Sequence, residues 1–244
     1  MSRFFAFGCS FTSYEWPTWA DIVLKDTSGL NWGRGGAGNP FIFESLVECI
    51  LTHTINKDDI VCIMWTNVTR EDRYNNKEWR TPGNIHTTGL QDKKHFNDTR
   101  GFYIRDLAVM YAAKKMLDQI GCKYYFTSMV PITHASQYDS VDHSDNITDI
   151  LPAYKEVLDI VRPSVYESVF DSDWGSRDLA KTSNGFIDLH PTPSLHIEYL
   201  EKELPELYQL LSTETIEWAR NIDKLLLDGK SYNHLWTQSI PSRW

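Results

Sequence analysis

The chain has 244 residues, of which 41% are hydrophobic and 23% charged, and its formal net charge at pH 7 is -9. This length and composition are typical of one globular domain and argue against extensive disorder. The acidic balance lacks the basic stripe that binding to a phosphate backbone requires, so we expect no nucleic-acid partner.

The length of the apolar runs and the pattern of cysteines indicate the cellular compartment of the protein. No apolar run approaches the ~20 residues of a membrane span, and Phe4 to Phe7 is too short for a signal-peptide core. Cys9, Cys49, Cys62 and Cys122 have no CxxC spacing, and three of them lie inside apolar runs. We therefore expect a soluble, cytoplasmic protein with reduced, buried thiols and no membrane contact.

Short apolar runs alternate with longer segments of helical period along the chain. This alternation is typical of βα units on a mainly parallel sheet, so it predicts an α/β fold. The predicted strands are Arg3 to Phe7, Leu30 to Trp32, Ile60 to Trp65, Lys123 to Met129 and Gly185 to Ile187. We expect residues 1–229 to form one domain and residues 230–244 a tail.

Helical patterns fill the intervals between and after these strands. Asn39 can cap a first helix, and a second is predicted from Phe102 to Ile120. The pattern from Leu195 to Leu211 predicts a third helix with a bend at Pro205, and residues 216–227 predict a fourth.

Two polar segments interrupt the alternation. Residues 67–100 are rich in Trp, Asn, Lys and Arg, and residues 131–149 carry several aspartates. Both follow central strands, and long insertions after the strands of an open α/β sheet lie over the edge where ligands bind. We expect them to contact a substrate, although each could also be a plain surface loop.

Ser10 follows the first predicted strand, in the sequence Gly8-Cys9-Ser10-Phe11-Thr12. The strand stops at a glycine and presents a small hydroxyl residue at the first βα turn, which lies at the ligand edge of such a sheet. Ser10 is therefore a candidate nucleophile, while a serine at this place can also serve only the turn.

Asp188-Leu189-His190-Pro191 follows the last predicted strand. An aspartate and a histidine two residues apart can meet when the backbone turns, and the carboxylate then orients the imidazole. The alternative is an exposed histidine in a structural loop. Because the carboxyl ends of parallel strands share one edge, we expect Ser10, Asp188 and His190 to converge there.

Donors for a developing oxyanion are available on the same edge. Gly36 could expose a backbone N–H beside a ligand because no side chain is in the way. Asn67, just past the third strand, could supply a side-chain amide.

In chain order, these features resemble the sequence blocks of the SGNH (GDSL-like) hydrolases. Gly8-Cys9-Ser10-Phe11-Thr12 is similar to the nucleophile block, Gly36 falls where the second block has its oxyanion glycine, and Asp188-Leu189-His190-Pro191 is similar to the last block. Trp65-Thr66-Asn67-Val68 resembles the third block, with Trp65 and Val68 in place of its Gly and Asp. Cys9 stands where the first block has an aspartate that is not the triad acid.

The resemblance implies a three-layer α/β/α fold with a five-stranded, mainly parallel sheet, and ester hydrolysis through a serine acyl-enzyme. Ser10 would be the nucleophile, His190 the general base and Asp188 the acid that holds the imidazole. The Ser10 amide, the Gly36 amide and the Asn67 side chain would bind the oxyanion. No cofactor or metal is needed.

Other side chains are expected to contact the substrate, which we expect to be a small-molecule or glycan acyl ester. The four candidates are Trp65, Arg70, Asn39 and His196, and His196 is also an alternative base. Trp79, Tyr74, His86 and Arg80 in the first insertion suit a sugar better than a long lipid chain. An O-acetylated glycan is therefore the first substrate to consider.

Three other functions remain open. Gly33-Arg34-Gly35-Gly36-Ala37-Gly38 satisfies GxGxxG before a helix, as in dinucleotide-binding folds, although the next strand ends without the ribose-binding acid. Asp188, His190 and His196 with a further carboxylate could hold a catalytic metal. A catalytically inactive protein of the same fold could bind carbohydrate or have a structural role.

Overall fold

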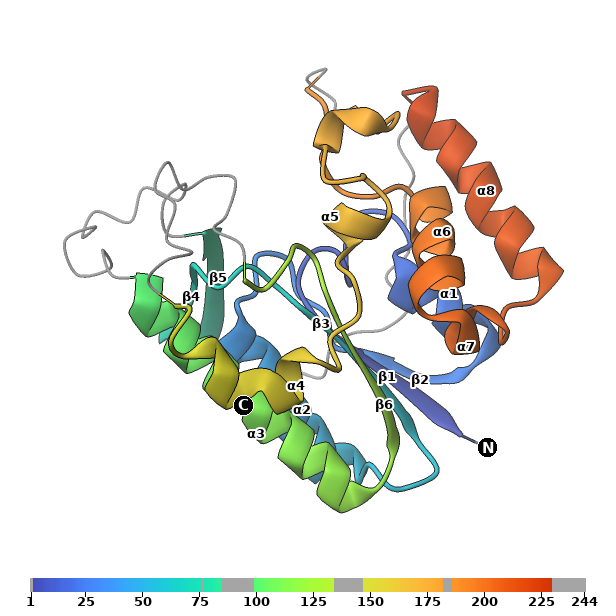
Figure 1. Ribbon diagram of the computed structural model, residues 1–244. Helices are drawn as coiled ribbons and strands as arrows, with labels where there is room; N and C mark the ends of the chain where they lie inside the picture. The colour runs from blue at the N-terminus through green and yellow to red at the C-terminus, as the bar shows by residue number, and fades with distance from the viewer. Residues whose placement is uncertain (1, 76, 85–98, 134–146, 182–185, 230–244) are drawn as a thin grey trace.

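The computed structural model describes residues 2–75, 77–84, 99–133, 147–181 and 186–229. Its central sheet has four parallel strands in the order β2-β1-β3-β6 (Figure 1). These strands are β1 (Arg3–Phe7), β2 (Ser28–Asn31), β3 (Ile60–Trp65) and β6 (Lys123–Ser128). The register places Phe5 beside Leu30 on one side and Val61 on the other.

Helices cover both faces of this sheet (Figure 1). On one face lie α2 (Asn39–His53) and α3 (Thr99–Ile120), and on the other lie α1 (Trp19–Asp26), α6 (Pro193–Glu203), α7 (Pro205–Tyr208) and α8 (Thr213–Leu227). The shorter helical elements are η3 (Leu151–Tyr154), α4 (Lys155–Leu158), α5 (Val165–Ser168) and η4 (Trp174–Ser176). The predicted three-layer α/β fold is confirmed.

The two central strands are apolar on both faces because helices cover both sides. Phe4 to Phe7 of β1 and Val61 to Trp65 of β3 are buried without interruption, which is typical of a parallel sheet. β2 forms one edge of the sheet and is only partly buried.

The predicted strand at 185–187 is wrong. Residue 185 lies outside the described residues, and Ile187 forms only an isolated antiparallel bridge with Lys181. Phe186 and Ile187 are 73% and 63% exposed, so this apolar pair does not belong to the sheet. The sheet has four strands instead of five.

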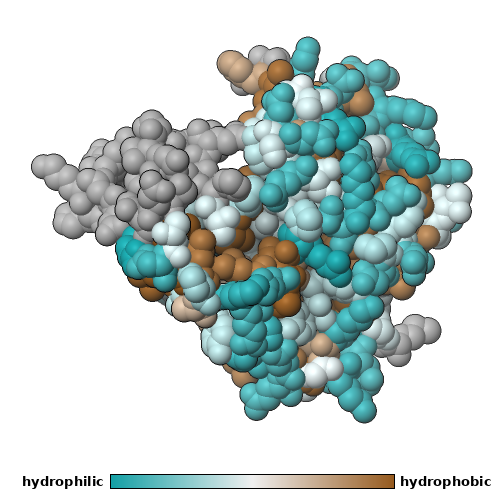
Figure 2. Space-filling view, in the orientation of Figure 1, coloured by the Kyte–Doolittle hydropathy of each residue, from teal (hydrophilic) through white to brown (hydrophobic). Residues whose placement is uncertain are grey.

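The place beyond β6 is taken by a different segment. Val161 forms an isolated parallel bridge with Phe126, and the Arg162 amide donates to the Phe126 carbonyl at 2.9 Å. The next amide that could continue this pairing is that of Ser164, and it donates to Glu167 Oε2 at 2.9 Å, so the pairing stays a single bridge. Figure 2 shows hydrophobic residues gathered in the middle of this face of the molecule.

Part of the segment predicted to be irregular, residues 67–100, folds into an antiparallel hairpin. β4 (Arg70–Asn75) pairs with β5 (Glu78–Asn84), and residues 85–98 lie outside the described residues. The hairpin packs on the chain that leads into α2, because Arg34 donates to the Trp79 carbonyl at 2.6 Å. Of the other insertion, residues 134–146 also lie outside the described residues.

Helix α2 begins without the predicted asparagine cap. Gly38 occupies the cap position, and the Asn39 side chain instead donates to buried Asp106 on α3 at 2.8 Å. The Gly38 and Phe41 amides donate to the Asp72 carboxylate at 2.9 and 3.0 Å. The cap of α2 is therefore supplied by the hairpin, from a residue distant in sequence.

Asp106 makes the stability of the protein depend on pH. Burial raises the pKa of Asp106 to about 7, although the Arg105 charge and the hydrogen bonds from Arg105 and Asn39 oppose this shift. A carboxyl whose folded-state pKa lies above its unfolded value stabilises the protein fully below the unfolded pKa. This contribution is lost as pH rises through the folded pKa, so the window runs from about pH 4 to about pH 7.

In the wild type the free energy of unfolding should fall as the pH rises from about 4.5 to about 8. We expect this fall to be smaller in Asp106→Asn by about 1–3 kcal/mol. Urea titrations at the two pH values measure this difference. Asp58→Asn, which removes an exposed carboxylate, serves as the control. An equal fall in the wild type and Asp106→Asn would contradict the prediction.

The remaining predicted helices are confirmed with small changes of boundary. Helix α3 begins three residues before Phe102. It ends at Gly121, which has a φ of +74° and whose backbone N–H donates a hydrogen bond to the Leu117 carbonyl. The predicted bend at Pro205 is the break between α6 and α7. Helix α1 has no counterpart in the sequence prediction.

All four cysteines are free and buried, as expected. No helix within the described ranges combines the length and the hydropathy that crossing a bilayer requires.

Candidate active site

Ser10 lies in a tight turn directly after β1. The amides of Thr12 and Ser13 both donate to the Cys9 carbonyl, at 3.0 and 3.1 Å. Gly8 makes this turn possible, because a Cβ there would lie 2.0 Å from the Thr12 hydroxyl oxygen. Ser10 is 9% exposed, and no protein group in the described part of the chain forms a hydrogen bond with its hydroxyl.

The side chains of Asp188 and His190 are hydrogen-bonded to each other, as expected from their spacing in the sequence. His190 Nδ1 lies 2.6 Å from Asp188 Oδ1, and the His190 backbone amide donates to the same oxygen at 3.0 Å. The Asp188 amide donates to the Ala180 carbonyl at 2.9 Å, which fixes the start of this segment. The side chains of His190 and Asp188 are 24% and 10% exposed.

Tyr14 holds this pair from the side of the first turn, and sequence reasoning missed it. Its hydroxyl donates to Asp188 Oδ2 at 2.6 Å, and its ring stacks on the His190 imidazole with 3.6 Å between centroids. Trp16 adds a second link because its indole N–H donates to the Pro191 carbonyl at 2.8 Å. The only signal in the sequence is an aromatic residue four positions after Ser10, and nothing in that spacing indicates which loop it meets.

Electrostatics favour an ionised carboxylate at Asp188. Burial alone would raise the pKa of Asp188, but the hydrogen bonds from His190 and Tyr14 outweigh it and hold the pKa below its usual range. Burial and the bond to Asp188 raise the pKa of Tyr14 well above its ordinary value. Tyr14 therefore stays protonated and continues to donate.

The turn after β1 encloses the imidazole. The Phe11 ring lies edge-on to His190 with 5.3 Å between centroids, and Tyr14 stacks on it. Residues one and four positions after Ser10 thus contact the predicted base. Within the described residues no hydrogen bond joins Ser10 to His190, so that pairing stays a prediction.

Gly36 occupies a turn that only glycine fits. The Ala37 amide donates to the Arg34 carbonyl at 3.1 Å, and Gly36 has a φ of +73°. A Cβ on Gly36 would lie 2.2 Å from the Thr81 carbonyl oxygen of the hairpin. The Gly36 amide has no acceptor among the described residues and is free to meet an oxyanion.

Asn67 follows β3 and has its side chain held by its own loop. Its Oδ1 accepts from the Thr69 amide at 2.8 Å and from the Thr69 hydroxyl at 2.5 Å. Because the oxygen is fixed, the orientation of the Nδ2 group is fixed too. That group has no acceptor in the described part of the chain, so it remains available as a donor.

Two predicted substrate contacts belong to the core. Trp65 is fully buried and packs edge-on against Phe126 with 5.4 Å between centroids. Asn39 is also fully buried and holds the end of β3, because its Oδ1 accepts from the Thr66 amide at 2.8 Å. Both lie out of reach of a ligand in solution, so we leave them out of the proposed site.

His196 is buried in α6 and is a poor alternative base. Burial, with a smaller effect from the charge of nearby His190, lowers the pKa of His196 to about 3. An imidazole with so low a pKa does not take up a proton near neutral pH. Of the hairpin residues expected to suit a sugar, Tyr74 is 52% exposed, while His86 lies outside the described residues.

The alternative sites meet structural obstacles. A dinucleotide phosphate would need the N-terminal amides of α2, and Asp72 already accepts from the amides of Gly38 and Phe41. For a metal site, both carboxylate oxygens of Asp188 are engaged, by His190 and Tyr14. Searched over the described residues, the His, Cys, Asp and Glu side chains form no group of three that could hold a metal ion.

No protein-family model matches the chain, and no curated protein sequence matches it. The solved structures similar to the chain include two proteins that are named as G-D-S-L or GDSL-like proteins. One is a member of the lipolytic protein G-D-S-L family from Veillonella parvula, with 15% identity, a TM-score of 0.47, and coverage of 83% of this chain and 98% of that chain. Another is a GDSL-like lipase from Bacteroides thetaiotaomicron, with 12% identity, a TM-score of 0.43, and coverage of 85% and 88%.

Proposed function

We propose that this chain is a serine esterase that cleaves a small acyl ester through Ser10, His190 and Asp188. The observation that carries the proposal is the Asp188–His190 pair, closed at 2.6 Å and held by Tyr14 against the turn that contains Ser10. An acid that orients a histidine, next to a turn whose serine hydroxyl has no hydrogen-bond partner among the described residues, supports activation of that hydroxyl as a nucleophile.

The acylation step uses the Asp188–His190 pair and the Ser10 hydroxyl, which has no hydrogen-bond partner among the described residues. Asp188 accepts the Nδ1 proton of His190, which leaves the Nε2 lone pair to take the Ser10 hydroxyl proton. Ser10 Oγ then bonds to the ester carbonyl carbon. His190 gives its proton to the alcohol oxygen as the ester C–O bond breaks, so the acyl group stays on Ser10.

The second half repeats the chemistry with water. His190 takes a proton from water, the hydroxide attacks the acyl-enzyme, and Ser10 leaves with its proton restored as the carboxylic acid departs. In both halves the oxyanion would receive the amide N–H of Ser10, the amide N–H of Gly36 and the Nδ2 group of Asn67. Catalytic hydrogen bonds are often long without substrate, which is consistent with the open Ser10–His190 pair.

An O-acetyl group on a carbohydrate is the first substrate we propose. The support comes from the hairpin beside Gly36, where exposed Tyr74 and half-buried Trp79 lie with 5.6 Å between ring centroids. Aromatic rings with polar edges suit a sugar.

A fluorophosphonate probe tests the mechanism directly. We expect it to label Ser10 in the wild type, to label His190→Ala far more slowly, and to leave Ser10→Ala unlabelled. Ser13→Ala, a change in the same turn, should be labelled like the wild type. Labelling of active protein at any residue other than Ser10 would overturn the mechanism. Glycan binding without ester turnover or labelling would select the inactive binding protein instead.

We expect Tyr14→Phe to lower kcat/KM for para-nitrophenyl acetate by about tenfold. The phenyl ring can still stack on His190, but Asp188 loses one of its two side-chain donors and holds the imidazole less firmly. Steady-state kinetics measure the change, with Tyr111→Phe on the exposed face of α3 as the control. An unchanged kcat/KM in Tyr14→Phe would show that this hydrogen bond does not position the pair.

A further inference from the structure

Arg70, at the start of β4, has a half-buried guanidinium without a carboxylate partner among the described residues. Its Nη1 donates to the Ala37 carbonyl at 3.1 Å, and its Nη2 lies 3.6 Å from Met129 Sδ. Its Nε is buried and has no hydrogen-bond partner. Neutral acceptors of this kind leave the charge of the group uncompensated.

Four other half-buried arginines are paired with carboxylates: Arg3 with Asp59 at 2.6 Å, Arg100 with Asp149 at 2.7 Å, Arg105 with Asp106 at 2.7 Å, and Arg177 with Glu198 at 2.6 Å. Half-buried Arg34 also has no carboxylate partner among the described residues; it donates to the Trp79 carbonyl and lies over the Phe41 ring. In a chain whose net charge is -9, acidic side chains are in excess. Of the two half-buried arginines without a carboxylate partner among the described residues, Arg70 is the one with a buried Nε that has no hydrogen-bond partner there.

The acids beside Arg70 in the sequence are engaged elsewhere. Glu71 pairs with Arg105 at 3.1 Å, and Asp72 accepts the two amides at the start of α2. Neither can turn to Arg70 without giving up these bonds. Within the described residues the hairpin thus holds its first arginine without a carboxylate partner, while its next two residues are fixed.

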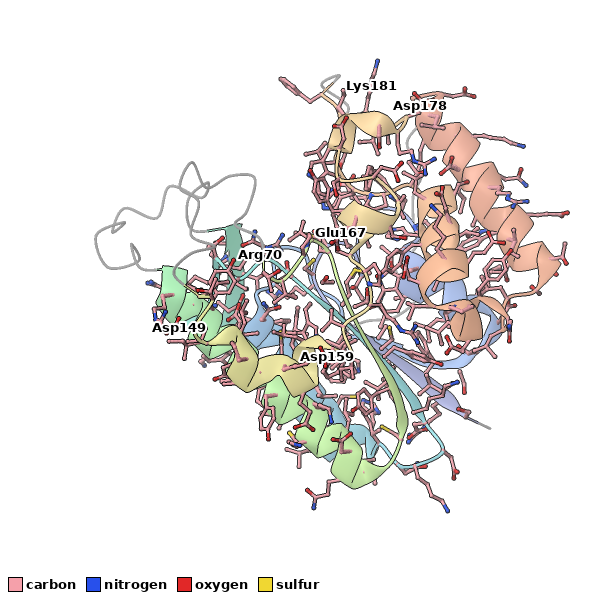
Figure 3. The ribbon with its side chains drawn as sticks, viewed as in Figure 1. Arg70, Asp149, Asp159, Glu167, Asp178 and Lys181 are labelled. Carbon is pink, nitrogen blue, oxygen red and sulfur yellow. The ribbon has the colours of Figure 1, made fainter. Side chains whose placement is uncertain are left out.

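Arg70 lies next to the proposed oxyanion site. Its acceptor Ala37 directly follows Gly36, and Met129 Sδ is also 3.8 Å from the sulfur of Cys9, the residue before Ser10. Figure 3 shows Arg70 between the β4–β5 hairpin and α5. The guanidinium is therefore separated from the nucleophile turn by one methionine side chain.

We propose that Arg70 binds a carboxylate carried by the substrate, so that the protein prefers esters with a carboxylate a few bonds away from the scissile carbonyl. The inference rests on the proposed esterase function. A guanidinium has five N–H groups. One N–H of Nη1 faces the Ala37 carbonyl, one N–H of Nη2 faces Met129 Sδ, and the N–H of Nε is buried. One N–H on each of Nη1 and Nη2 is left. Two N–H groups match the two oxygens of a carboxylate.

Two esters with acyl chains of equal length test this preference. Para-nitrophenyl valerate is neutral, and mono-para-nitrophenyl glutarate has a carboxylate at the far end of its acyl chain. We expect the ratio of kcat/KM for the anionic ester to that for the neutral ester to fall by about tenfold or more in Arg70→Gln. Arg70→Lys, which keeps the charge without the planar fork, should give an intermediate ratio. Arg73→Gln removes the same charge from the same strand and should leave the ratio unchanged.

Titration calorimetry with glutarate separates the two proposals, because glutarate binds without turnover. We expect Arg70→Gln to bind glutarate at least about tenfold more weakly than the wild type and Arg73→Gln. If the esters are cleaved but the ratio and the glutarate affinity do not change, the anion site is wrong and the esterase proposal stands. If neither ester is cleaved, the esterase proposal fails, and glutarate affinity alone decides whether Arg70 binds carboxylates. Thermal unfolding of each variant verifies that it is folded.

Discussion

Ser10→Ala is expected to lower kcat/KM for para-nitrophenyl acetate by at least about a thousandfold while the protein stays folded. The alanine removes the nucleophile, and any remaining rate comes from binding and the oxyanion donors. Stability should change by less than about 0.5 kcal/mol, because the Ser10 hydroxyl has no hydrogen-bond partner among the described residues. Steady-state kinetics and urea unfolding of the same preparation measure both quantities.

Non-additivity distinguishes a triad from three unrelated effects. If Ser10 and His190 act in one step, the double variant Ser10→Ala/His190→Ala should be no slower than Ser10→Ala alone. Ser13→Ala in the same turn should retain the wild-type rate. If Ser10→Ala keeps more than about a tenth of the wild-type kcat/KM, Ser10 is not the nucleophile, because replacing the serine of a working triad lowers the rate far more than this.

The sequence predicts the parts of the site that depend on local pattern. β1 and β3 are uninterrupted apolar runs, so their ends can be located, and Ser10 and Asn67 follow those ends within a few residues. Asp188 and His190 are two residues apart, which allows their contact to be expected from the chain alone. In each case the relevant distance along the chain is short.

Strand pairing is not a local property, and there the prediction fails. Phe186 and Ile187 form an apolar run like the true strands, but such a run does not show which sheet edge its backbone would pair with. The bridge beside β6 is made by Val161, and Phe186 and Ile187 are exposed near Asp188.

Contacts between distant segments are equally invisible in one sequence. Asp72 caps α2 from a hairpin that reads as an irregular polar stretch, and Tyr14 meets Asp188 across 174 positions. Neither residue belongs to a periodic pattern or a motif. Arg70 could be proposed as a ligand contact from its place after β3, whereas only the folded chain shows that it has no carboxylate partner among the residues the structure describes.

Asp188→Asn is expected to lower kcat/KM by about a thousandfold or more, with Asp178→Asn, an exposed carboxylate, as the control. In the wild type each carboxylate oxygen accepts one side-chain donor, His190 on Oδ1 and Tyr14 on Oδ2. If the asparagine NH₂ faces His190, the imidazole proton moves to Nε2, and the base cannot accept from Ser10. If the NH₂ faces Tyr14, the tautomer is kept, but the negative charge that stabilises the imidazolium is gone. Nitrogen NMR of His190 reports which tautomer is present.

The pH dependence of stability tests the same carboxylate without substrate. The pKa of Asp188 is lowered in the folded protein, so its contribution to stability is present above the unfolded pKa and is lost as pH falls through the folded value. We therefore expect Asp188→Asn to cost about 1–3 kcal/mol of unfolding free energy near pH 7 and progressively less below about pH 4. A cost that does not shrink in acid would mean that packing, and not the ionised carboxylate, joins this segment to Tyr14. In that case, a loss of activity in Asp188→Asn would be explained by displacement of His190, and not by loss of the negative charge beside the imidazole.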